Sequence, residues 1–328
     1  MTPGRDDARA AVQRLANSTR ALITGHQRPD GDSLGSQLAL AELASALGVG
    51  TVVVNCDPAP GTLEELPGYD RVAVGDSLPD DFPNGFDLVV AVECPELERA
   101  GFPGLDRLPI LNIDHHPANP RYGEVNYVDA EAPATGEMVW RMFRASGVEP
   151  SPAAATNAYV ALSTDTGDFR YSNATGRAFR TAAEMVDAGA DPTVVAQWIH
   201  GHRKAAAVLL LGEALSTLRL DGDGSIAVIE LDEGAFRRAG AKPEDTEDII
   251  NHPRAIDGVR AVVFLKQWER GAVRVSLRSV GAVDVRRVAE RFGGGGHANA
   301  AGCTLRGDLA SAREPVVAAV REALGTGS

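Results

Sequence analysis

Eight side chains of metal-ligand type lie between residues 26 and 165, and most of them follow a short apolar run. They are His26, Asp30, Asp32, Glu93, Asp114, His115, His116 and Asp165. Mixed histidine and carboxylate ligation favours manganese, cobalt or zinc over calcium or a magnesium site made of oxygen alone. Two such ions about 3.5–4 Å apart can polarise a phosphate and deprotonate a water that they share. The pattern therefore predicts a two-metal hydrolytic site with a bridging hydroxide.

Some of these residues also have a purely structural explanation, which the sequence leaves open. Asp30 could cap a helix or form a turn, and Asp165 could cap the segment after it, since Asp is common at such positions. The adjacent histidines could be a surface pair. Glu93 is harder to explain in this way, because a carboxylate at the end of a buried strand must be paired or bound to a metal. Glu96, in the string VECPE, is an alternative ligand in its place.

The elements that position these residues can be read from alternating patterns. The apolar runs ALITG, DLVVAV and LPILNI end at His26, Glu93 and Asp114. Helix-like stretches such as SLGSQLALAELASALG and TGEMVWRMFRASG separate the runs or follow them. Short strands that alternate with helices predict a parallel α/β sheet. Because ligands bind beyond the carboxyl ends of parallel strands, residues far apart in the sequence are expected to meet there.

The length of 328 residues favours two domains over one. We predict an α/β catalytic domain over residues 1–190, a helical linker over 191–217, and a smaller α+β domain over 218–328. The string DGDGS marks a turn before the strand-like runs SIAVIEL, VRAVVFLKQW and GAVRVSLRSV.

A glycine run near the end of the chain is the second candidate site. FGGGGHANAAGC carries Gly293 to Gly296 and then His297, between a helix-like and a strand-like segment. A flexible linker is the alternative, but consecutive glycines also let backbone N–H groups approach an anion. Arg278 and Ser279, at the end of VRVSLRS, would add a phosphate-binding fork and a hydroxyl donor.

The composition excludes some classes of function but does not identify the substrate. The net charge of −13 comes entirely from residues 1–218, with 16 Lys+Arg against 29 Asp+Glu, whereas residues 219–328 hold 16 of each. The charge therefore excludes no anionic substrate. Three dispersed cysteines, no apolar leader and no apolar run of membrane-spanning length predict a cytoplasmic protein. With 5% aromatic residues and no basic-aromatic surface, binding of long nucleic acids is not expected.

The strings ITGHQRPDGDSLGS, VVAVECPE, ILNIDHHPAN and LSTDTGDF resemble the signature motifs of the DHH phosphoesterase superfamily. The resemblance implies that His26 and Asp30 bind one metal and that Asp32, His115 and Asp165 bind the other. It places Glu93 at the position of the aspartate that bridges the two metals. It implies that His116 contacts the scissile phosphate and that Asp114 orients its neighbours. Glu93 departs from the usual Asp by one methylene, so we expect altered metal spacing or preference, and reduced activity is one outcome.

The second part of the chain is similar to the DHH-associated C-terminal domain, and the whole chain is closest to the NrnA-type oligoribonucleases (nanoRNases). This resemblance implies hydrolysis of very short RNA to 5′-mononucleotides and removal of the 3′-phosphate of 3′-phosphoadenosine 5′-phosphate (pAp). It implies two divalent ions, most readily Mn²⁺, with Co²⁺, Mg²⁺ or Zn²⁺ as alternatives, and a homodimer. The expected nucleotide contacts are Arg278, Ser279, Gly294, Gly295, Gly296 and His297.

Other functions stay open at this point. A cyclic-di-AMP or linear dinucleotide phosphodiesterase would use the same chemistry. A family II inorganic pyrophosphatase shares the first motifs but lacks the glycine run, and a RecJ-like exonuclease normally has a longer chain. A nucleotide-binding sensor of low activity is the non-enzymatic alternative, because Glu93 could impair turnover.

Overall fold

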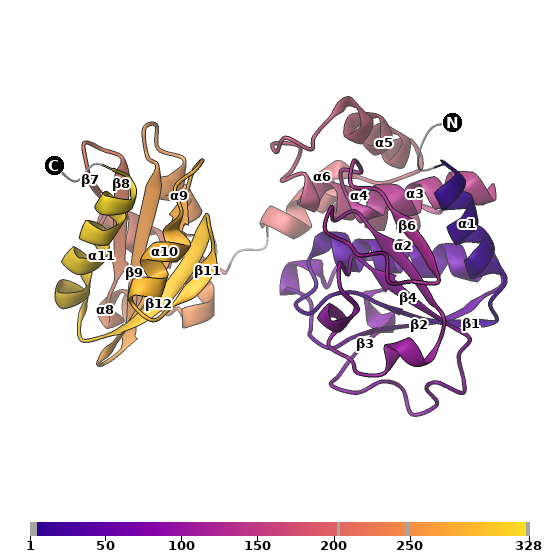
Figure 1. Cartoon of the computed structure of the whole chain (residues 1–328). Coiled ribbons are helices and arrows are strands. Elements are labelled where there is room, and N and C mark those ends of the chain that lie inside the picture. The colour runs from indigo at the N-terminus through magenta and orange to yellow at the C-terminus, as the bar shows by residue number, and fades with distance from the viewer. Residues whose placement is uncertain (1–4, 202–203, 247–248, 326–328) are drawn as a thin grey trace. The chain divides into compact units, whose positions relative to one another are not determined.

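The computed structural model describes residues 5–201, 204–246 and 249–325, in two compact units (Figure 1). The first unit is Met1–His202 and the second is Arg203–Ser328. The segment predicted as a helical linker, 191–217, is divided between them. Its first helix, α6 (Pro192–Ala196), lies in the first unit, and α7 (Ala205–Ser216) lies in the second.

The first unit is built on a six-stranded sheet with the order β3-β2-β1-β4-β5-β6. Every neighbouring pair is parallel, which confirms the predicted α/β class. All residues of β4 and β5 are buried, and this explains why both strands read as continuous apolar runs. The strands are β1 (Arg20–Thr24), β2 (Gly50–Asn55), β3 (Val72–Val74), β4 (Leu88–Val92), β5 (Ile110–Asp114) and β6 (Val125–Val128).

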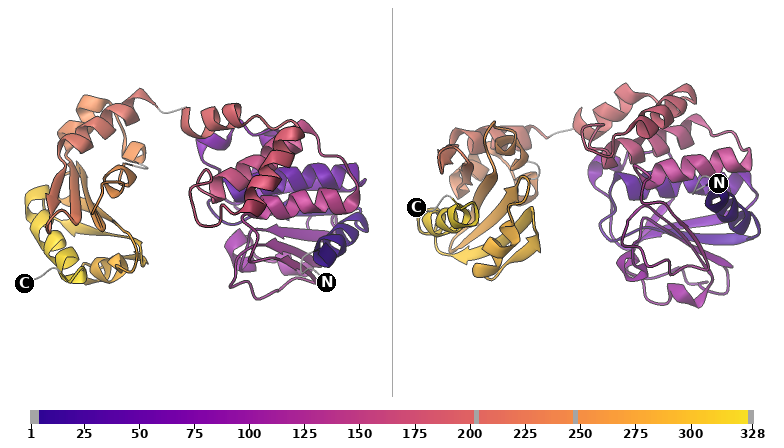
Figure 2. Two further views of the ribbon diagram at one scale, coloured as in Figure 1. Left: turned by 90° about the horizontal axis from the view of Figure 1, so that it is seen from above. Right: turned by 45° about the horizontal axis from the view of Figure 1, so that its top comes forward.

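Long helices cover one face of this sheet, and short helical turns cover the other (Figures 1 and 2). Strand alternation divides the core accordingly, so that Ile23 faces the long helices while Leu22 faces the short turns. The long helices are α1 (Arg5–Ala16), α2 (Gly31–Ala46), α3 (Thr135–Ser146), α4 (Pro152–Asp165) and α5 (Gly176–Asp187). The short turns on the other face are η3 (Leu97–Ala100) and η4 (Leu105–Arg107), whereas η1 (Gly61–Leu63), η2 (Tyr69–Arg71) and the π-helical η5 (Gln197–Gly201) pack against the core of the long helices.

Helices α2 and α4 approach each other closely because α2 carries glycine at the contact. A Cβ atom on Gly35 would lie 2.4 Å from the backbone oxygen of Asn157. A Cβ atom on Gly31, at the start of the helix, would lie 2.4 Å from Oγ1 of Thr164. The N-terminus of α2 is therefore held beside the C-terminus of α4, where Asp165 is the last residue.

The strand order fixes where a ligand can bind. The neighbours β1 and β4 lie at the centre of the sheet, and the chain adds β2 and β3 on one side of them and β5 and β6 on the other. Open parallel sheets bind ligands beyond the carboxyl ends of strands at such a switch in direction. The residues after β1, β4 and β5 are consequently the candidates for chemistry.

The second unit has a mixed six-stranded sheet with the order β11-β12-β10-β9-β8-β7. The pair β8–β9 is parallel, and the other neighbours are antiparallel. Its strands are β7 (Arg219–Asp221), β8 (Ile226–Leu231), β9 (Ala261–Glu269), β10 (Ala272–Ser279), β11 (Gly295–His297) and β12 (Ala300–Arg306). Its other helices are α8 (Glu233–Ala239), η6 (Pro243–Thr246), α9 (Asn251–Arg254), α10 (Val285–Arg291) and α11 (Leu309–Ala323).

Helices pack on both faces of this second sheet, so the predicted α+β unit has two apolar cores. Residues of α10 and α11 pack with Val263, Val275 and other strand residues on one face. Residues of α7 and α8, with the chain around α9, pack with Val262 and Phe264 on the other face.

Two expectations from composition can be compared with the structure. Cys56, Cys94 and Cys303 are all free thiols, so no disulfide joins them. Within the described ranges, no helix combines the length and apolar character that a membrane crossing requires.

The close α2–α4 contact predicts that Gly35→Ala destabilises the first unit. Alanine normally favours a helix over glycine, but here its Cβ atom would meet a backbone oxygen. Overpacking of this kind costs about 1–3 kcal/mol. Urea unfolding followed by circular dichroism should report this loss. The matched control is Gly176→Ala in α5, where the nearest atom is Nη1 of the flexible Arg180, 3.3 Å away; an equal loss in both variants would contradict the packing explanation.

Candidate metal centre

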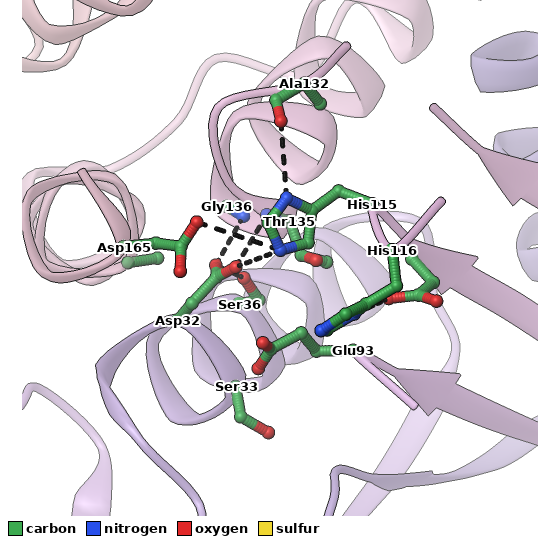
Figure 3. Close-up of polar contacts among 12 residues, drawn as sticks. Asp32, Ser33, Ser36, Glu93, His115, His116, Ala132, Thr135, Gly136 and Asp165 are labelled. Atoms are coloured by element: carbon green, nitrogen blue, oxygen red, sulfur yellow. Dashed lines mark hydrogen bonds and ion pairs between the residues drawn. The ribbon is translucent and has the colours of Figure 1, made fainter. Parts of the chain in front are cut away.

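The predicted ligands meet at the carboxyl edge of the first sheet. His26 follows β1, Glu93 follows β4, and Asp114, which ends β5, is followed by two histidines. The N-terminus of α2 and the C-terminus of α4 bring the remaining carboxylates to the same place (Figure 3). The His and carboxylate atoms form three groups, and within each group the possible ligand atoms lie within 4.8 Å of one another.

One group contains His26, Asp30 and Glu93. His26 Nε2 lies 3.2 Å from Oε2 of Glu93 and 3.7 Å from Oδ1 of Asp30. The opposite ring nitrogen, Nδ1, lies 2.7 Å from the backbone oxygen of Gln27, which leaves Nε2 directed at the carboxylates. Asp30 also accepts the N–H of Ser33 and caps α2, so its structural and ligand explanations are compatible.

A second group contains Asp32, His115 and Asp165. His115 Nε2 lies 3.7 Å from Oδ2 of Asp32 and 3.7 Å from Oδ2 of Asp165. The other ring nitrogen of His115 hydrogen-bonds to the backbone oxygen of Ala132 at 3.2 Å. A histidine ligand typically has this arrangement, in which one nitrogen donates to a carbonyl and the other is available to a metal.

Glu93 belongs to two of the three groups, because it also gathers with His115 and His116. The residue is 4% exposed. Figure 3 shows its carboxylate beside Asp32 and His116. Its backbone has φ of +55°, a left-handed conformation that is unfavourable for a residue with a Cβ atom. The alternative residue, Glu96, is exposed and belongs to none of these groups.

Asp114 organises the histidine loop and has no accessible surface. Its Oδ1 accepts a hydrogen bond from Nδ1 of His116 at 2.8 Å, and its Oδ2 accepts one from Nδ2 of Asn119 at 2.6 Å. These contacts fix the orientation of the His116 ring, which points toward Glu93 (Figure 3). Burial opposes its charge, but the contacts with His116 and Asn119 hold the pKa of Asp114 below its usual value.

The same edge concentrates negative charge. Burial, together with the charges of Asp165 and Asp30, raises the pKa of Asp32 to about 7. Burial and the nearby Asp32 also raise the pKa of Glu93 well above its usual value. Burial opposes the charge of His26, yet Asp30 and Glu93 raise the pKa of its ring to about 10. The protein alone balances these carboxylates with protons, and divalent cations could balance them instead.

Several supporting contacts cannot be recognised from local sequence. Asp32 accepts backbone N–H groups from Thr135 and Gly136 at 2.8 and 2.9 Å, so it caps α3 from a different helix. Asn173 donates Nδ2 to the backbone oxygen of Asp165 at 3.1 Å. Thr135 and Gly136 lie more than 100 residues from Asp32, and Asn173 lies eight residues beyond Asp165, outside its helix, so no local pattern indicates either contact.

Two residues predicted to act together in the second unit point in opposite directions. Arg278 and Ser279 are neighbours on β10, so strand alternation sends their side chains to different faces. The hydroxyl of Ser279 is buried, donates to the backbone oxygen of Val283 at 2.6 Å and accepts from Nδ2 of Asn299 at 2.9 Å. Ser279 therefore connects the turn after β10 with Asn299, which precedes β12, and its side chain lies on the other face of the sheet from that of Arg278.

The glycine run is also more structured than expected. The Gly294 N–H donates to the backbone oxygen of Ala289 at 2.9 Å, and a Cβ atom there would lie 2.1 Å from the backbone oxygen of Gly302. Gly294 thus closes helix α10 against β12 and does not form an open anion nest. Gly295 and Gly296 lie in β11 at the edge of the sheet, whereas the side chain of His297 lies outside the described part.

Comparison with known proteins agrees with both units. Residues 20–163 match the N-terminal domain of the DHH family, and residues 223–326 match the DHHA1 domain. A Thermus thermophilus protein named "Bifunctional oligoribonuclease and PAP phosphatase NrnA" is 37% identical over 92% of this chain and 89% of its own length. A Bacillus subtilis protein of the same name is 27% identical over 87% of this chain and 88% of its own length.

A solved structure supports the fold across the chain. The crystal structure of an exopolyphosphatase-related protein from Bacteroides fragilis superposes with a TM-score of 0.80 at 23% identity, covering 99% of this chain and 98% of its own. A parallel sheet whose carboxyl edge carries paired histidine and carboxylate groups is the architecture of a metal-dependent hydrolase. This chain belongs to the DHH family of phosphoesterases, together with its NrnA-type members.

The geometry predicts that Glu93→Gln weakens the response to divalent metal. Adding Mn²⁺ to protein treated with EDTA should raise the unfolding temperature of the wild type, because a ligand at 100 times its Kd stabilises by about 2.7 kcal/mol. The variant keeps the side-chain shape but loses the carboxylate that two groups share, so its temperature rise should be smaller. Differential scanning fluorimetry over a metal titration measures the unfolding temperatures of the wild type and the variant.

Asp129→Asn provides the control for this experiment, since Asp129 pairs with Arg141 and Arg177 and belongs to none of the three groups. That variant should show the same temperature rise as the wild type, whatever its starting stability. A full response in Glu93→Gln would argue against a metal ligand at this position.

Proposed function

We propose that this protein is a metal-dependent phosphoesterase that hydrolyses very short oligoribonucleotides to 5′-mononucleotides and removes the 3′-phosphate of pAp. The observation that supports this most is the pair of His and carboxylate groups that meet at Glu93. The names of the relatives supply the substrates, because they are called oligoribonucleases and PAP phosphatases over nearly the full length of this chain.

The residues at the sheet edge fit two divalent cations. In this proposal His26 and Asp30 would hold one ion, Asp32, His115 and Asp165 would hold the other, and Glu93 would be the carboxylate that both share. When bound, two such ions would polarise the phosphate and lower the pKa of a water between them. Mixed His and carboxylate ligands favour Mn²⁺, with Co²⁺, Zn²⁺ or Mg²⁺ as further candidates.

His116 is our candidate for contact with the scissile phosphate. Asp114 accepts the Nδ1 hydrogen bond and thereby fixes the ring, so that Nε2 is left for a ligand oxygen. A positioned donor at the place where negative charge develops can contribute a large part of catalysis. Asp114 itself is buried, and we assign it the role of holding His116 and Asn119 in place.

The second unit would bind the nucleotide through Arg278 and the edge glycines Gly295 and Gly296. Arg278 is half-buried on the sheet face opposite Ser279, and Arg254 lies close enough to lower its pKa further than burial alone. An arginine fork suits a phosphate, whereas Ser279 and Gly294 support the local backbone. A homodimer and a cytoplasmic location stay predictions from the sequence.

A comparison of four substrates tests the proposed activity. In buffer with Mn²⁺, the full chain should release mononucleotides from a diribonucleotide and inorganic phosphate from pAp, while cyclic-di-AMP and pyrophosphate should react more slowly. Chromatographic separation of the products measures all four reactions. Faster hydrolysis of cyclic-di-AMP would favour the dinucleotide phosphodiesterase, and failure to cleave any nucleotide with any divalent metal would refute the proposal.

The Glu93→Asp variant separates an enzyme from a sensor in the same assay. Strong activity of the wild type would exclude the sensor alternative. An inert wild type whose aspartate variant hydrolyses pAp would instead identify Glu93 as the change that removed turnover.

We expect Arg278→Ala to weaken nucleotide recognition without damaging the metal centre. Loss of hydrogen bonds to a charged group costs about 1.5–3 kcal/mol, which corresponds to a roughly 10- to 100-fold lower kcat/KM for pAp. Hydrolysis of bis(p-nitrophenyl) phosphate, which has no nucleoside, should change little. Arg291→Ala is the control, because Arg291 lies on α10 and pairs with Glu322. Equal losses on both substrates would show that Arg278 is no nucleotide contact.

A further inference from the structure

Four cationic side chains gather on one face of the second sheet, and we call them the cationic face: Arg254, Lys266, Arg274 and Arg278. Lys266 on β9 is directly opposite Arg274 on the antiparallel strand β10. Like charges opposite each other in a sheet normally destabilise it. Strand alternation places Arg278 on the same face as Arg274, because the two are four residues apart on one strand.

Two of these cations, Lys266 and Arg278, are partly withdrawn from water, whereas Arg254 and Arg274 are exposed. Lys266 is half-buried, donates from Nζ to Oγ of Ser276 at 3.0 Å and lies 4.8 Å from the ring centroid of Phe264. Burial, together with the charges of Arg274 and Arg278, lowers the pKa of Lys266 to about 8. The neutral side chains of Ser276 and Phe264 hold Lys266 in place, while the charges of Arg274 and Arg278 repel it.

Carboxylates elsewhere in this unit neutralise arginines, but none neutralises the cationic face. Among the described residues, no ion pair joins any of its four members to an acidic side chain. By contrast, Arg238, Arg313 and Arg321 are each paired with a carboxylate. Since residues 219–328 hold equal numbers of acidic and basic residues, the lack of partners on this face is not a shortage of acid.

The face is also open beside these side chains. On β12, the residues opposite Arg278 and Ser276 are Ala300 and Gly302, which project little or nothing above the sheet. The apolar core on this side takes its strand residues from β8 and β9, within the part that the structure describes. A ligand could therefore lie along β10 without displacing packed side chains.

The spacing indicates the kind of ligand. A strand rises about 3.3 Å per residue, so positions 274, 276 and 278 present their side chains about 7 Å apart along one line. Lys266 reaches the middle of this line through its contact with Ser276. A row of separated cations suits a chain of phosphates better than one compact anion.

We propose that Lys266 and Arg274 form a second phosphate subsite, which continues from Arg278 and binds an additional backbone phosphate of a short oligonucleotide. This inference rests on the proposed function, and it assigns length recognition to two residues that are not among the nucleotide contacts expected from the sequence. The repulsion between Lys266 and Arg274 is then relieved when the phosphate binds.

Binding measured without cleavage tests this subsite. The probe is a 5′-phosphorylated triribonucleotide with a 3′-fluorescein, mixed with the full chain in EDTA and followed by fluorescence anisotropy. A labelled mononucleotide with one phosphate is the comparison ligand. Lys266→Gln and Arg274→Gln should each raise the Kd for the triribonucleotide about tenfold or more. Their slopes of log Kd against log salt should fall by about 0.7 for the lost phosphate contact.

Stability separates this role from a structural one. Each variant removes one of two opposed like charges, so its unfolding temperature should equal or exceed that of the wild type. Arg291→Gln removes the same charge from the other side of the unit and should leave the Kd unchanged. Unaltered Kd and salt slope in Lys266→Gln and Arg274→Gln would overturn the inference, as would an equal loss of affinity for both ligands.

The two proposals fail separately in this design. A protein that cleaves no nucleotide, yet loses triribonucleotide binding in these variants, would keep the subsite and refute the proposed activity. A protein that cleaves short RNA but binds it equally well in all variants would keep the activity and refute the subsite.

Discussion

Repulsion among buried carboxylates is the constraint on which the first unit depends. Asp32 and Glu93 are almost inaccessible to solvent, and Asp165 shares His115 with Asp32. Carboxylates that lie this close cannot all be ionised without a counter-charge. The fold nonetheless holds them together, because Asp32 accepts two backbone N–H groups from α3 and the short α2–α4 contact fixes Asp165 beside it. The fold therefore keeps together carboxylates whose repulsion bound cations would relieve.

The second unit has the same imbalance with the opposite sign. Lys266 and Arg274 are opposed across two strands, and Arg278 continues the row, without a described carboxylate partner. One surface thus carries an excess of negative charge and the other an excess of positive charge. In the proposed function, divalent metals would neutralise the acidic edge and phosphates would neutralise the basic face. The net charge of the chain conceals this complementarity, because it sums two surfaces that do not resemble each other.

Local sequence predicted the parallel sheet, and the structure brings the candidate ligands together at its edge, for one physical reason. Buried strands such as β4 read as continuous apolar runs, and their carboxyl ends must share one edge, so the ligand types after them could be placed together. The hydrogen bonds that hold Asp32 and Asp165 could not be predicted, because Thr135 and Asn173 reach these two residues only after the helices have packed. The left-handed backbone of Glu93 likewise depends on its surroundings.

The case of Ser279 is different, because the sequence itself indicates where its side chain lies. Adjacent residues of a strand point to opposite faces, so the side chains of Arg278 and Ser279 lie on different faces of β10. The same alternation selects Arg274 and Ser276 as the partners of Arg278, and pairing with β9 adds Lys266. Motif similarity emphasises residues that are neighbours in the sequence, whereas one face of a sheet carries the side chains of every second residue of a strand. Recognition by this unit is therefore better derived from the strand register than from the motif.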